Sequence, residues 1–246
     1  MYRGKKIAII IPARYGSKRF PGKPLALIAG QPMIQWVYQG AKKSALADRL
    51  IVATDDQRIV QAVKEFGAEV FLTKGNYRCG SERVAAVAKK IKAEVIVNLQ
   101  GDEPLVDPKL IDQGVRILVD NKAKVATPIK KITDQKEIAN PNVVKVVKDK
   151  NNNALYFSRS VIPHQPKNYS NYYEHIGLFI FRRDLLLQFA QWPPSPLEKA
   201  EDLEQLRILE NGFKIRVYQT DYQSQSVNVF ADLKKVEKII SKNNGS

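Results

Sequence analysis

Basic side chains and glycines share one short segment near the start of the chain. Residues 12–23 read PARYGSKRFPGK and carry Arg14, Lys18, Arg19 and Lys23. Gly16 and Gly22 allow tight turns and a close approach of the backbone to a ligand. An arginine side chain can bind two phosphate oxygens at once, in bidentate fashion, and lysine supplies a point charge. The segment therefore predicts a loop that binds phosphate.

The surrounding pattern supports this chemistry. Residues 7–11 are apolar and predict a buried strand, and residues 32–45 have helical spacing. A cationic, glycine-bearing loop between a strand and a helix is suited to hold an anion. The segment contains neither GxxxxGK[ST] nor GxGxxG, which excludes a Walker A loop and a dinucleotide-binding turn. An ordinary solvated loop is the alternative.

An acidic segment follows a later strand. Residues 94–99 (EVIVNL) predict a strand, and residues 100–104 read QGDEP. Ligands of open α/β sheets bind at the carboxyl ends of the strands. A carboxylate there can bind Mg²⁺ and present it to a phosphate, so Asp102 is the candidate metal ligand. The alternative is an aspartate that caps the next helix.

Two further polar groups are candidates for binding. Residues 77–83 (YRCGSER) lead into a helix predicted over residues 81–91, where Ser81 either caps the helix or contacts a base or sugar. Cys79 has no histidine in its motif and is not proposed as a nucleophile. Arg159 is suited to bind a substrate carboxylate. His175 is either structural or a ligand contact.

Strand-like and helix-like segments alternate over the first half of the chain. This pattern predicts an α/β fold, with a mixed, mainly parallel sheet covered by helices on both faces. Strands at 143–148 and 154–157 are joined by DKNNN, which predicts an antiparallel hairpin. Residues 172–181 predict one more strand, and 195–212 one helix that begins with a capping box. We expect a single domain over residues 1–246, in which residues 129–182 form an inserted antiparallel portion.

Composition sets limits on the class of protein. The chain has 246 residues, a net charge of +15 and a single cysteine. One cysteine excludes an internal disulfide and favours a reducing cytoplasm. The longest apolar runs are too short to span a bilayer, so no membrane partner is expected. The charge alone admits a nucleic-acid-binding module, but the lysines are spread along the chain rather than gathered in a basic block.

Several of these segments together resemble the 3-deoxy-manno-octulosonate (Kdo) cytidylyltransferase family. In chain order they are PARYGSKRFPGKPL, NLQGDEP, NPNVVKVV, ALYFSRSVIP, HIGLFIF and SPLEKAEDLEQLRILENG. The resemblance extends from about residue 7 to residue 240. It implies a Rossmann-like nucleotidyltransferase fold, a homodimer and Mg²⁺. The implied reaction joins CTP and Kdo into CMP-Kdo and pyrophosphate, for lipopolysaccharide biosynthesis.

The resemblance also implies roles for individual residues. Arg14 and Lys23 would bind the triphosphate, with Ser17 and Arg19 in the same loop. Ser81 and Gln100 would contact the nucleotide, and Asp102 would hold Mg²⁺. The implied sugar-acid contacts are Arg159, His175, Glu204, Gln205 and, as a weaker candidate, Arg83.

One departure concerns the metal. The family usually has Val-Asp-Thr-Pro-Glu-Asp-Leu near the C-terminus, whose first aspartate is a second Mg²⁺ ligand. Here residues 227–233 read VNVFADL, so the neutral Asn228 takes that position. Phe179 also stands where tyrosine is common. We expect Asn228 still to coordinate or position the metal.

Three alternatives stay open. The chain could activate another sugar acid, such as sialate or an 8-amino analogue of Kdo. It could be an inactive sugar-nucleotide-binding relative, which only Asn228 suggests. A nucleic-acid-binding module rests on charge alone, and the resemblance implies no nucleic-acid partner.

Overall fold

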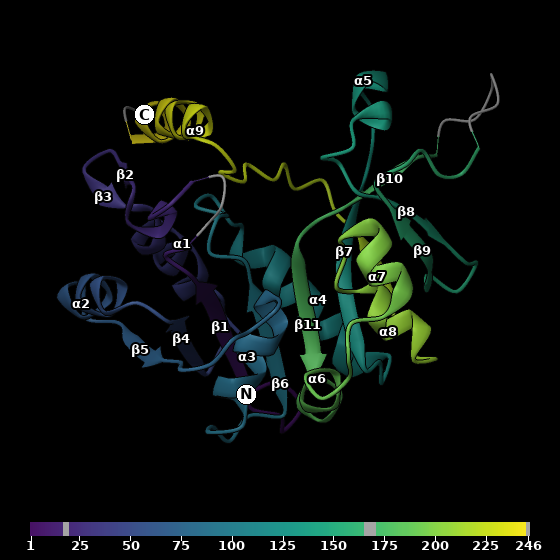
Figure 1. Ribbon diagram of the computed structural model, residues 1–246, viewed down its shortest axis with the longest axis horizontal. Helices are drawn as coiled ribbons and strands as arrows, with labels where there is room; N and C mark the ends of the chain where they lie inside the picture. The colour runs from purple at the N-terminus through teal and green to yellow at the C-terminus, as the bar shows by residue number, and fades with distance from the viewer. Residues whose placement is uncertain (17–19, 165–170, 245–246) are drawn as a thin grey trace.

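The computed structural model describes residues 1–16, 20–164 and 171–244. Within them, ten strands form one mixed sheet with helices on both faces (Figure 1). A parallel half continues into an antiparallel half, as predicted. No helix in these residues is long and apolar enough to cross a membrane.

The parallel half carries the strands that lead into the predicted loops. Its strands, in order across the sheet, are β5 (Glu69–Leu72), β4 (Arg49–Thr54), β1 (Ile7–Ala13) and β6 (Val95–Leu99). β1 pairs with β4 on one side and with β6 on the other, both in parallel. The carboxyl ends of β1 and β6 therefore lie side by side, and so do the two loops that follow them.

The antiparallel half adjoins β6 directly. Its members are β11 (Leu178–Arg182), β7 (Val125–Lys131), β10 (Tyr173–His175), β8 (Lys145–Lys148), β9 (Ala154–Ser158) and β12 (Arg216–Gln219). β11 pairs antiparallel with both β6 and β7, while β12 pairs parallel with β7. The predicted hairpin is present as β8 and β9. This half continues the main sheet instead of forming a separate sheet.

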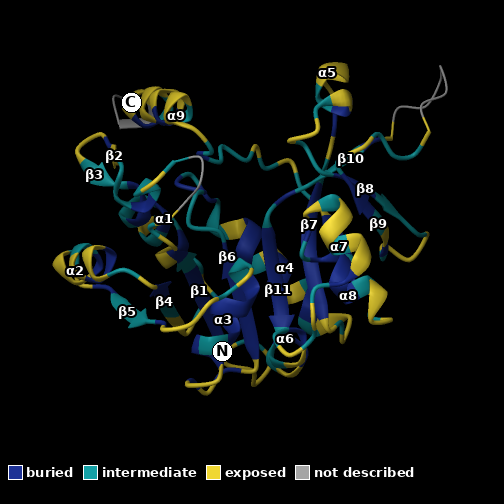
Figure 2. Ribbon diagram, in the orientation of Figure 1, coloured by how far each residue is buried: buried dark blue, intermediate teal, exposed yellow. Residues whose placement is uncertain are grey.

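Two apolar layers lie against the two faces of the sheet. In β1, Ile7, Ile9 and Ile11 join one layer, while Ala8 and Ile10 join the other. The first layer includes α1 (Met33–Lys42), α2 (Gln57–Glu65) and α4 (Pro108–Asp120). The second includes α3 (Gly80–Ala88), α6 (Arg183–Phe189) and α8 (Leu206–Glu210). The central strands are buried along their length because both of their faces are covered (Figure 2).

The remaining elements lie around the sheet. They are η1 (Lys23–Leu25), β2 (Leu27–Ile28), β3 (Gln31–Pro32), α5 (Gln135–Ala139), α7 (Pro196–Glu201) and α9 (Phe230–Asn244). β2 and β3 form a small hairpin. Residues of α9 pack with this hairpin in a third apolar cluster that includes Ile28, Val227 and Val236.

The prediction of one strand over residues 172–181 was wrong. The chain forms β10, turns at Ile176 and Gly177, and then forms β11. β10 pairs with β7 and β8, whereas β11 pairs with β6 and β7. Both halves pair with β7, with a shift of register between them, and they differ in the neighbour on the other side, which is β8 for β10 and β6 for β11.

The prediction of one helix over residues 195–212 was also wrong. Asp202 adopts the left-handed conformation with φ of 54°, which ends α7 before α8 begins. Tertiary contacts support the break, since the buried Arg207 of α8 binds Glu198 of α7 at 2.7 Å and Glu82 of α3 at 2.9 Å. The capping-box contact at the start of α7 is present, because the Ser195 backbone N–H donates to Glu198.

Ser81 does not cap its helix. α3 begins at Gly80, so the N-cap residue is Cys79. Ser81 lies inside the first turn, and its hydroxyl donates to Glu204 at 2.6 Å. A tertiary partner has therefore replaced the local backbone contact that the sequence suggested.

Candidate active site

The predicted phosphate loop leaves β1 and closes on itself. The Gly22 N–H donates to the Tyr15 carbonyl at 2.9 Å. Gly22 has φ of 71°, and a Cβ at this position would lie 3.2 Å from the Tyr15 ring. The positive φ favours glycine, and a side chain here would also crowd the Tyr15 ring. Arg14 is exposed at the start of the loop, while Ser17 and Arg19 lie outside the described residues.

The tyrosine of this loop also contacts a residue of α2. The guanidinium of Arg58 lies over the Tyr15 ring, 3.4 Å from its centroid. Asp56 holds that guanidinium through bonds of 2.9 and 2.7 Å. This cation–π contact fixes the start of the loop close to Arg14.

The loop after β6 is pressed against the loop after β1. A Cβ on Gly101 would lie only 2.8 Å from the Pro12 carbonyl oxygen, so the approach requires glycine. Directly after it, Asp102 accepts a hydrogen bond from the Lys23 ammonium at 2.7 Å. Two predicted site residues that are 79 positions apart in the sequence are therefore in contact.

A third segment joins these two loops. The Val227 N–H donates to the Asp102 backbone carbonyl at 2.9 Å, and Lys23 donates to the Val227 carbonyl at 2.9 Å. Asn228 therefore follows directly after a residue that is bonded to Asp102. Its amide donates to Ser226 at 3.0 Å. We call residues 12–23, 100–104 and 227–228 the loop side of the site.

The donors of the loop side fit a magnesium ion. Among the described residues, no group of three or more His, Cys, Asp or Glu side chains could hold a metal by itself. Mg²⁺ does not need such a group, because it keeps several waters and binds through one or two carboxylates together with substrate phosphates. Asp102 offers the carboxylate, and Asn228 offers an amide oxygen from the adjoining segment.

Gln100 and Ser81 lie at the border of the loop side. A Cβ on Gly80 would lie 3.7 Å from the Gln100 amide atoms, and one on Gly177 would lie 3.5 Å from its Cγ. The Gln100 side chain thus lies between the start of α3 and the turn before β11. Ser81 accepts from Asn98 at 2.9 Å and donates to Glu204.

The predicted sugar contacts Arg159 and Glu204 belong to a second group of charged residues. Arg159 donates to the backbone carbonyls of Glu201, Pro141 and Asp202 at 2.9, 3.1 and 3.4 Å. These acceptors are neutral, so they orient the guanidinium without cancelling its charge. We call Lys145, Arg159, His175, Glu201 and Glu204 the strand side of the site.

Lys145 is a member of the strand side that sequence reasoning missed. Its side chain is fully buried, and its ammonium donates to the carbonyls of Asn140, Val143 and Arg159 at 2.9, 2.7 and 2.6 Å. Burial lowers its pKa, and the neighbouring Arg159 lowers it further. A lysine between apolar residues in NVVKVV was the available signal.

His175 is held in one tautomer. The Thr127 hydroxyl donates to the Leu178 carbonyl at 2.7 Å, so it accepts from His175 Nε2 at 2.8 Å. The ring packs against Phe157 and Phe179, with centroids 5.1 Å away in each case. Burial lowers the pKa of His175 to about 3, which keeps the imidazole neutral. Its Nδ1 is then left as an acceptor.

The remaining predicted contacts divide between two places. Gln205 is buried, and its Nε2 has no hydrogen-bond partner in the part of the chain that the structure describes. Arg83 donates to Asp55 and to Thr73, each at 2.7 Å, next to β4 and β5. The structure therefore places Arg83 toward the outer parallel strands instead of with Arg159 and His175.

Glu103 is a second residue that sequence reasoning missed. The residue is 7% exposed, and its carboxyl accepts hydrogen bonds from the hydroxyls of Tyr222 and Ser224. Burial raises the pKa of Glu103 to about 7, and the adjacent Asp102 also raises it. Two acids in sequence thus have different tasks: one faces the site and one is buried beneath it.

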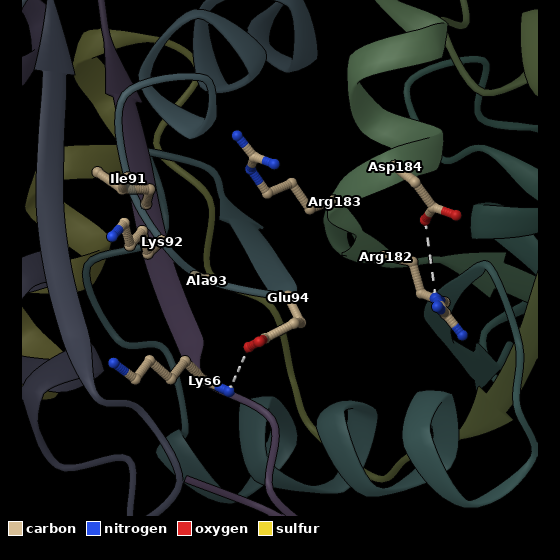
Figure 3. Close-up of a pocket in the computed structure, with 8 residues that line it drawn as sticks. All are labelled: Lys6, Ile91, Lys92, Ala93, Glu94, Arg182, Arg183 and Asp184. Atoms are coloured by element: carbon tan, nitrogen blue, oxygen red, sulfur yellow. Dashed lines mark hydrogen bonds and ion pairs between the residues drawn. The ribbon is translucent and has the colours of Figure 1, made fainter.

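A cavity at the other end of the sheet is not part of this site. It has a volume of about 540 Å³ and is lined by residues that include Lys6, Lys92, Glu94, Arg183 and Asp184 (Figure 3). Lys6 precedes β1 and Glu94 precedes β6, so the cavity lies at the amino ends of the parallel strands. Ligands of such sheets bind at the opposite edge.

The fold and the site together define a mixed α/β protein whose candidate site lies at the carboxyl edge of the parallel strands. The cytidylyltransferase family model matches residues 8–215. A 3-deoxy-manno-octulosonate cytidylyltransferase of Geobacter metallireducens is 46% identical over 250 residues, 96% of this chain and 98% of that protein. The corresponding protein of Solibacter usitatus is 47% identical over 96% of this chain and 94% of its own length.

A solved structure agrees with these sequences. The structure of CMP:2-keto-3-deoxy-manno-octonic acid synthetase complexed with CTP superposes with a TM-score of 0.92 and is 41% identical. The match covers 97% of this chain and 99% of that one. The chain belongs to the cytidylyltransferase family and, within it, to the 3-deoxy-manno-octulosonate cytidylyltransferases.

Proposed function

We propose that the protein transfers CMP from CTP to Kdo and releases pyrophosphate, for lipopolysaccharide biosynthesis. The observation that carries the proposal is the near-complete alignment, at 46% identity, with a relative named for this reaction. The contact between Lys23 and Asp102 supports it, because it joins the predicted phosphate loop to the candidate metal ligand. The fold alone would not carry it, since one fold serves many reactions.

In this proposal the loop side binds the triphosphate. Arg14 and Lys23 bind its phosphates, together with Ser17 and Arg19 of the same loop. Asp102 and Asn228 hold Mg²⁺, which neutralises charge on the phosphates when it is bound. Gln100 and Ser81 contact the nucleotide. Positioning and charge stabilisation account for the catalysis, and no covalent enzyme intermediate is required.

The strand side binds the sugar acid. Arg159 receives the carboxylate of the sugar in a charge-assisted pair. Neutral His175 accepts a hydrogen bond at Nδ1 from a hydroxyl of the sugar. Glu204 and the buried Gln205 offer further polar contacts. The anomeric hydroxyl then attacks the α-phosphorus in line, forming the new P–O bond as the bond to pyrophosphate breaks. Arg83 stays a weaker candidate, given its bonds to Asp55 and Thr73.

The setting of the enzyme is also part of the proposal. A cytoplasmic location is consistent with a single, free cysteine. A homodimer that uses the antiparallel portion over residues 129–182 is consistent with β9 at the edge of the sheet and with Leu155, which is 61% exposed on that strand. Gel filtration with light scattering tests the dimer.

A pyrophosphate-release assay tests the activity. It combines the protein with Mg²⁺, each of the four ribonucleoside triphosphates in turn, and a panel of Kdo, 8-amino-Kdo and sialate. We expect release with CTP and Kdo, and none when either substrate or the metal is omitted. Preference for another sugar acid would change the assigned substrate but not the type of reaction. Absence of release with every acid, together with steeply salt-dependent RNA or DNA binding, would replace the enzyme with a nucleic-acid-binding module.

A further inference from the structure

One long connection brings Asn228 to the loop side. Residues 220–229, here called the crossing segment, join β12 to α9 and contain neither helix nor strand. In Figure 1 the segment runs across the molecule from the β7 side to α9. An irregular segment of this length has no ladder of backbone bonds to fix it, so its individual contacts determine where Asn228 lies. At the α9 end, the backbone N–H groups of Asn228 and Val229 donate to Asp232 at 2.9 and 3.0 Å.

On the β12 side of Asn228, two residues of the segment bind Glu103. Ser224 Oγ donates to Glu103 Oε1 at 2.5 Å, and Tyr222 Oη donates to Oε2 at 3.2 Å. Tyr222 Oη also lies 3.2 Å from the Leu105 carbonyl. Each oxygen of one carboxyl therefore holds a different residue of the crossing segment. The next fastening is at Val227, whose N–H bonds to the carbonyl of Asp102, the residue before Glu103.

The arrangement separates two tasks between adjacent acids. The Asp102 carboxylate binds Lys23 and faces the proposed metal position. The Glu103 carboxyl is turned to the crossing segment and is almost fully buried. A buried carboxyl without partners would be costly, so the two hydroxyls and Glu103 stabilise one another.

We propose that Glu103 is a positioning residue that fixes Asn228 beside Asp102 by holding Ser224 and Tyr222 of the crossing segment. It acts on the reaction through Asn228 and does not touch the substrates. The kinetic part of this inference rests on the proposed function, whereas the fastening of the segment does not.

The chemistry of Glu103 selects informative variants. In Glu103→Gln the amide oxygen can accept from Ser224, and the amide nitrogen can donate to Tyr222, which then donates to the Leu105 carbonyl. Every polar group keeps a partner, so this variant should preserve the fastening. Glu103→Leu keeps similar bulk but removes both acceptors. Glu94→Leu is the matched control, because that carboxylate binds the Lys6 backbone N–H at the opposite edge of the sheet.

Hydrogen exchange on the full chain tests the fastening without any substrate. We expect exchange in residues 220–229 to be several-fold faster in Glu103→Leu than in wild type, Glu103→Gln or Glu94→Leu, because the open state of the segment becomes more populated. Unchanged exchange in Glu103→Leu would overturn the proposal. If that variant does not fold, Ser224→Ala replaces it with the same expected direction, and unchanged exchange there is equally decisive.

Kinetics test the link to Asn228. In Glu103→Leu we expect about a tenfold or larger rise in the Mg²⁺ concentration for half-maximal rate, together with a fall in kcat, as for other residues that orient metal ligands. The KM for the sugar acid should change less than twofold, and Glu103→Gln should restore the wild-type Mg²⁺ response. The positioning role would be overturned if Glu103→Gln changed the Mg²⁺ response and kcat as much as Glu103→Leu does. If wild type turns over no sugar acid, the proposed function fails, while the exchange result still decides the fastening.

Discussion

The loop side and the strand side of the site hold their charges in opposite ways. On the loop side, Arg14 is exposed, and Lys23 and Asp102, which we propose bind phosphate and metal, form an ion pair with each other. On the strand side, Arg159 and Lys145 are held by carbonyls of the chain itself. The loop side is completed by its ligands, whereas the strand side is built in advance. Substitutions should therefore affect reaction rate on one side and substrate affinity on the other.

The largest effect is expected at Asp102. Asp102→Asn removes the carboxylate that fits the metal, and kcat should fall about a thousandfold, because a metal supplies several kcal/mol of charge stabilisation. Initial rates of pyrophosphate release at saturating CTP and Kdo measure it. Asp107→Asn is the control, because asparagine can still cap α4 as Asp107 does. Near-normal turnover in Asp102→Asn would remove this residue from the metal site.

The next effect is expected at Arg159. Arg159→Ala should raise the KM for Kdo about a hundredfold and leave the KM for CTP nearly unchanged, because a charge-assisted bond contributes about 1.5–3 kcal/mol. Arg159→Lys keeps the charge but loses the planar fork, so it should lie between wild type and the alanine variant. Steady-state kinetics with each substrate varied in turn decide this. A rise in the KM for CTP alone would place the carboxylate contact elsewhere.

A third effect concerns stability and pH on the strand side. The folded pKa of His175, about 3, lies below the ordinary value of 6.5, so the unfolded chain binds a proton that the folded chain does not. The contribution of His175 to stability is therefore full above pH 6.5 and falls as pH decreases from 6.5 toward 3, with a slope of about 1.4 kcal/mol per pH unit. The raised pKa of Glu103, about 7, contributes with the opposite sign over part of this range, so the His175 contribution is measured as the difference in stability between wild type and a variant that cannot titrate at this position. Between pH 7 and pH 5 this difference should change by about 1–2 kcal/mol.

Urea unfolding between pH 4.5 and 7 checks this expectation. His175→Gln can still donate to Thr127 but cannot titrate, so its stability relative to wild type should increase as pH falls from 7 to 5. His164→Asn, at the exposed second histidine, should keep the wild-type dependence. Parallel curves for wild type and His175→Gln would show that His175 is not buried as a neutral ring.

The smallest effect is expected at the break between α7 and α8. Asp202 has φ of 54°, which glycine adopts more readily than any other residue. Asp202→Gly should therefore stabilise the fold by about 0.5–1 kcal/mol, and Asp202→Ala should destabilise it by a similar amount. Thermal unfolding measures both. If Asp202→Ala stabilised the protein, the left-handed break between α7 and α8 would not be maintained in solution.

The sequence predicted the loop side better than the strand side. Runs such as IAIII and VIVNL are buried on both faces and end abruptly, so the loops that follow them could be placed at one edge of a parallel sheet. Lys23 and Asp102 were expected at that edge, and they are in contact there. Local pattern sufficed because each loop begins where its strand ends.

The strand side depends on contacts that local sequence does not encode. Asp202 gives no sign of a helix break, because the break follows from the buried bonds of Arg207 to two different helices. Ser81 had the pattern of a cap, yet its partner lies 123 residues away. In QGDEP, nothing local distinguishes the acid that faces the site from the one that holds the crossing segment.

The bond between Ser81 and Glu204 bears on how substrate preference could be redesigned. Glu204 lies between α7 and α8, and it accepts both the hydroxyl and, at 3.3 Å, the backbone N–H of Ser81 in α3. Grafting residues 195–212 from a relative with another substrate would therefore also replace the acceptor for the first turn of α3. A transplant should carry residues 77–83 along with it. Residues 77–83 and 195–212 should therefore be exchanged together and not separately.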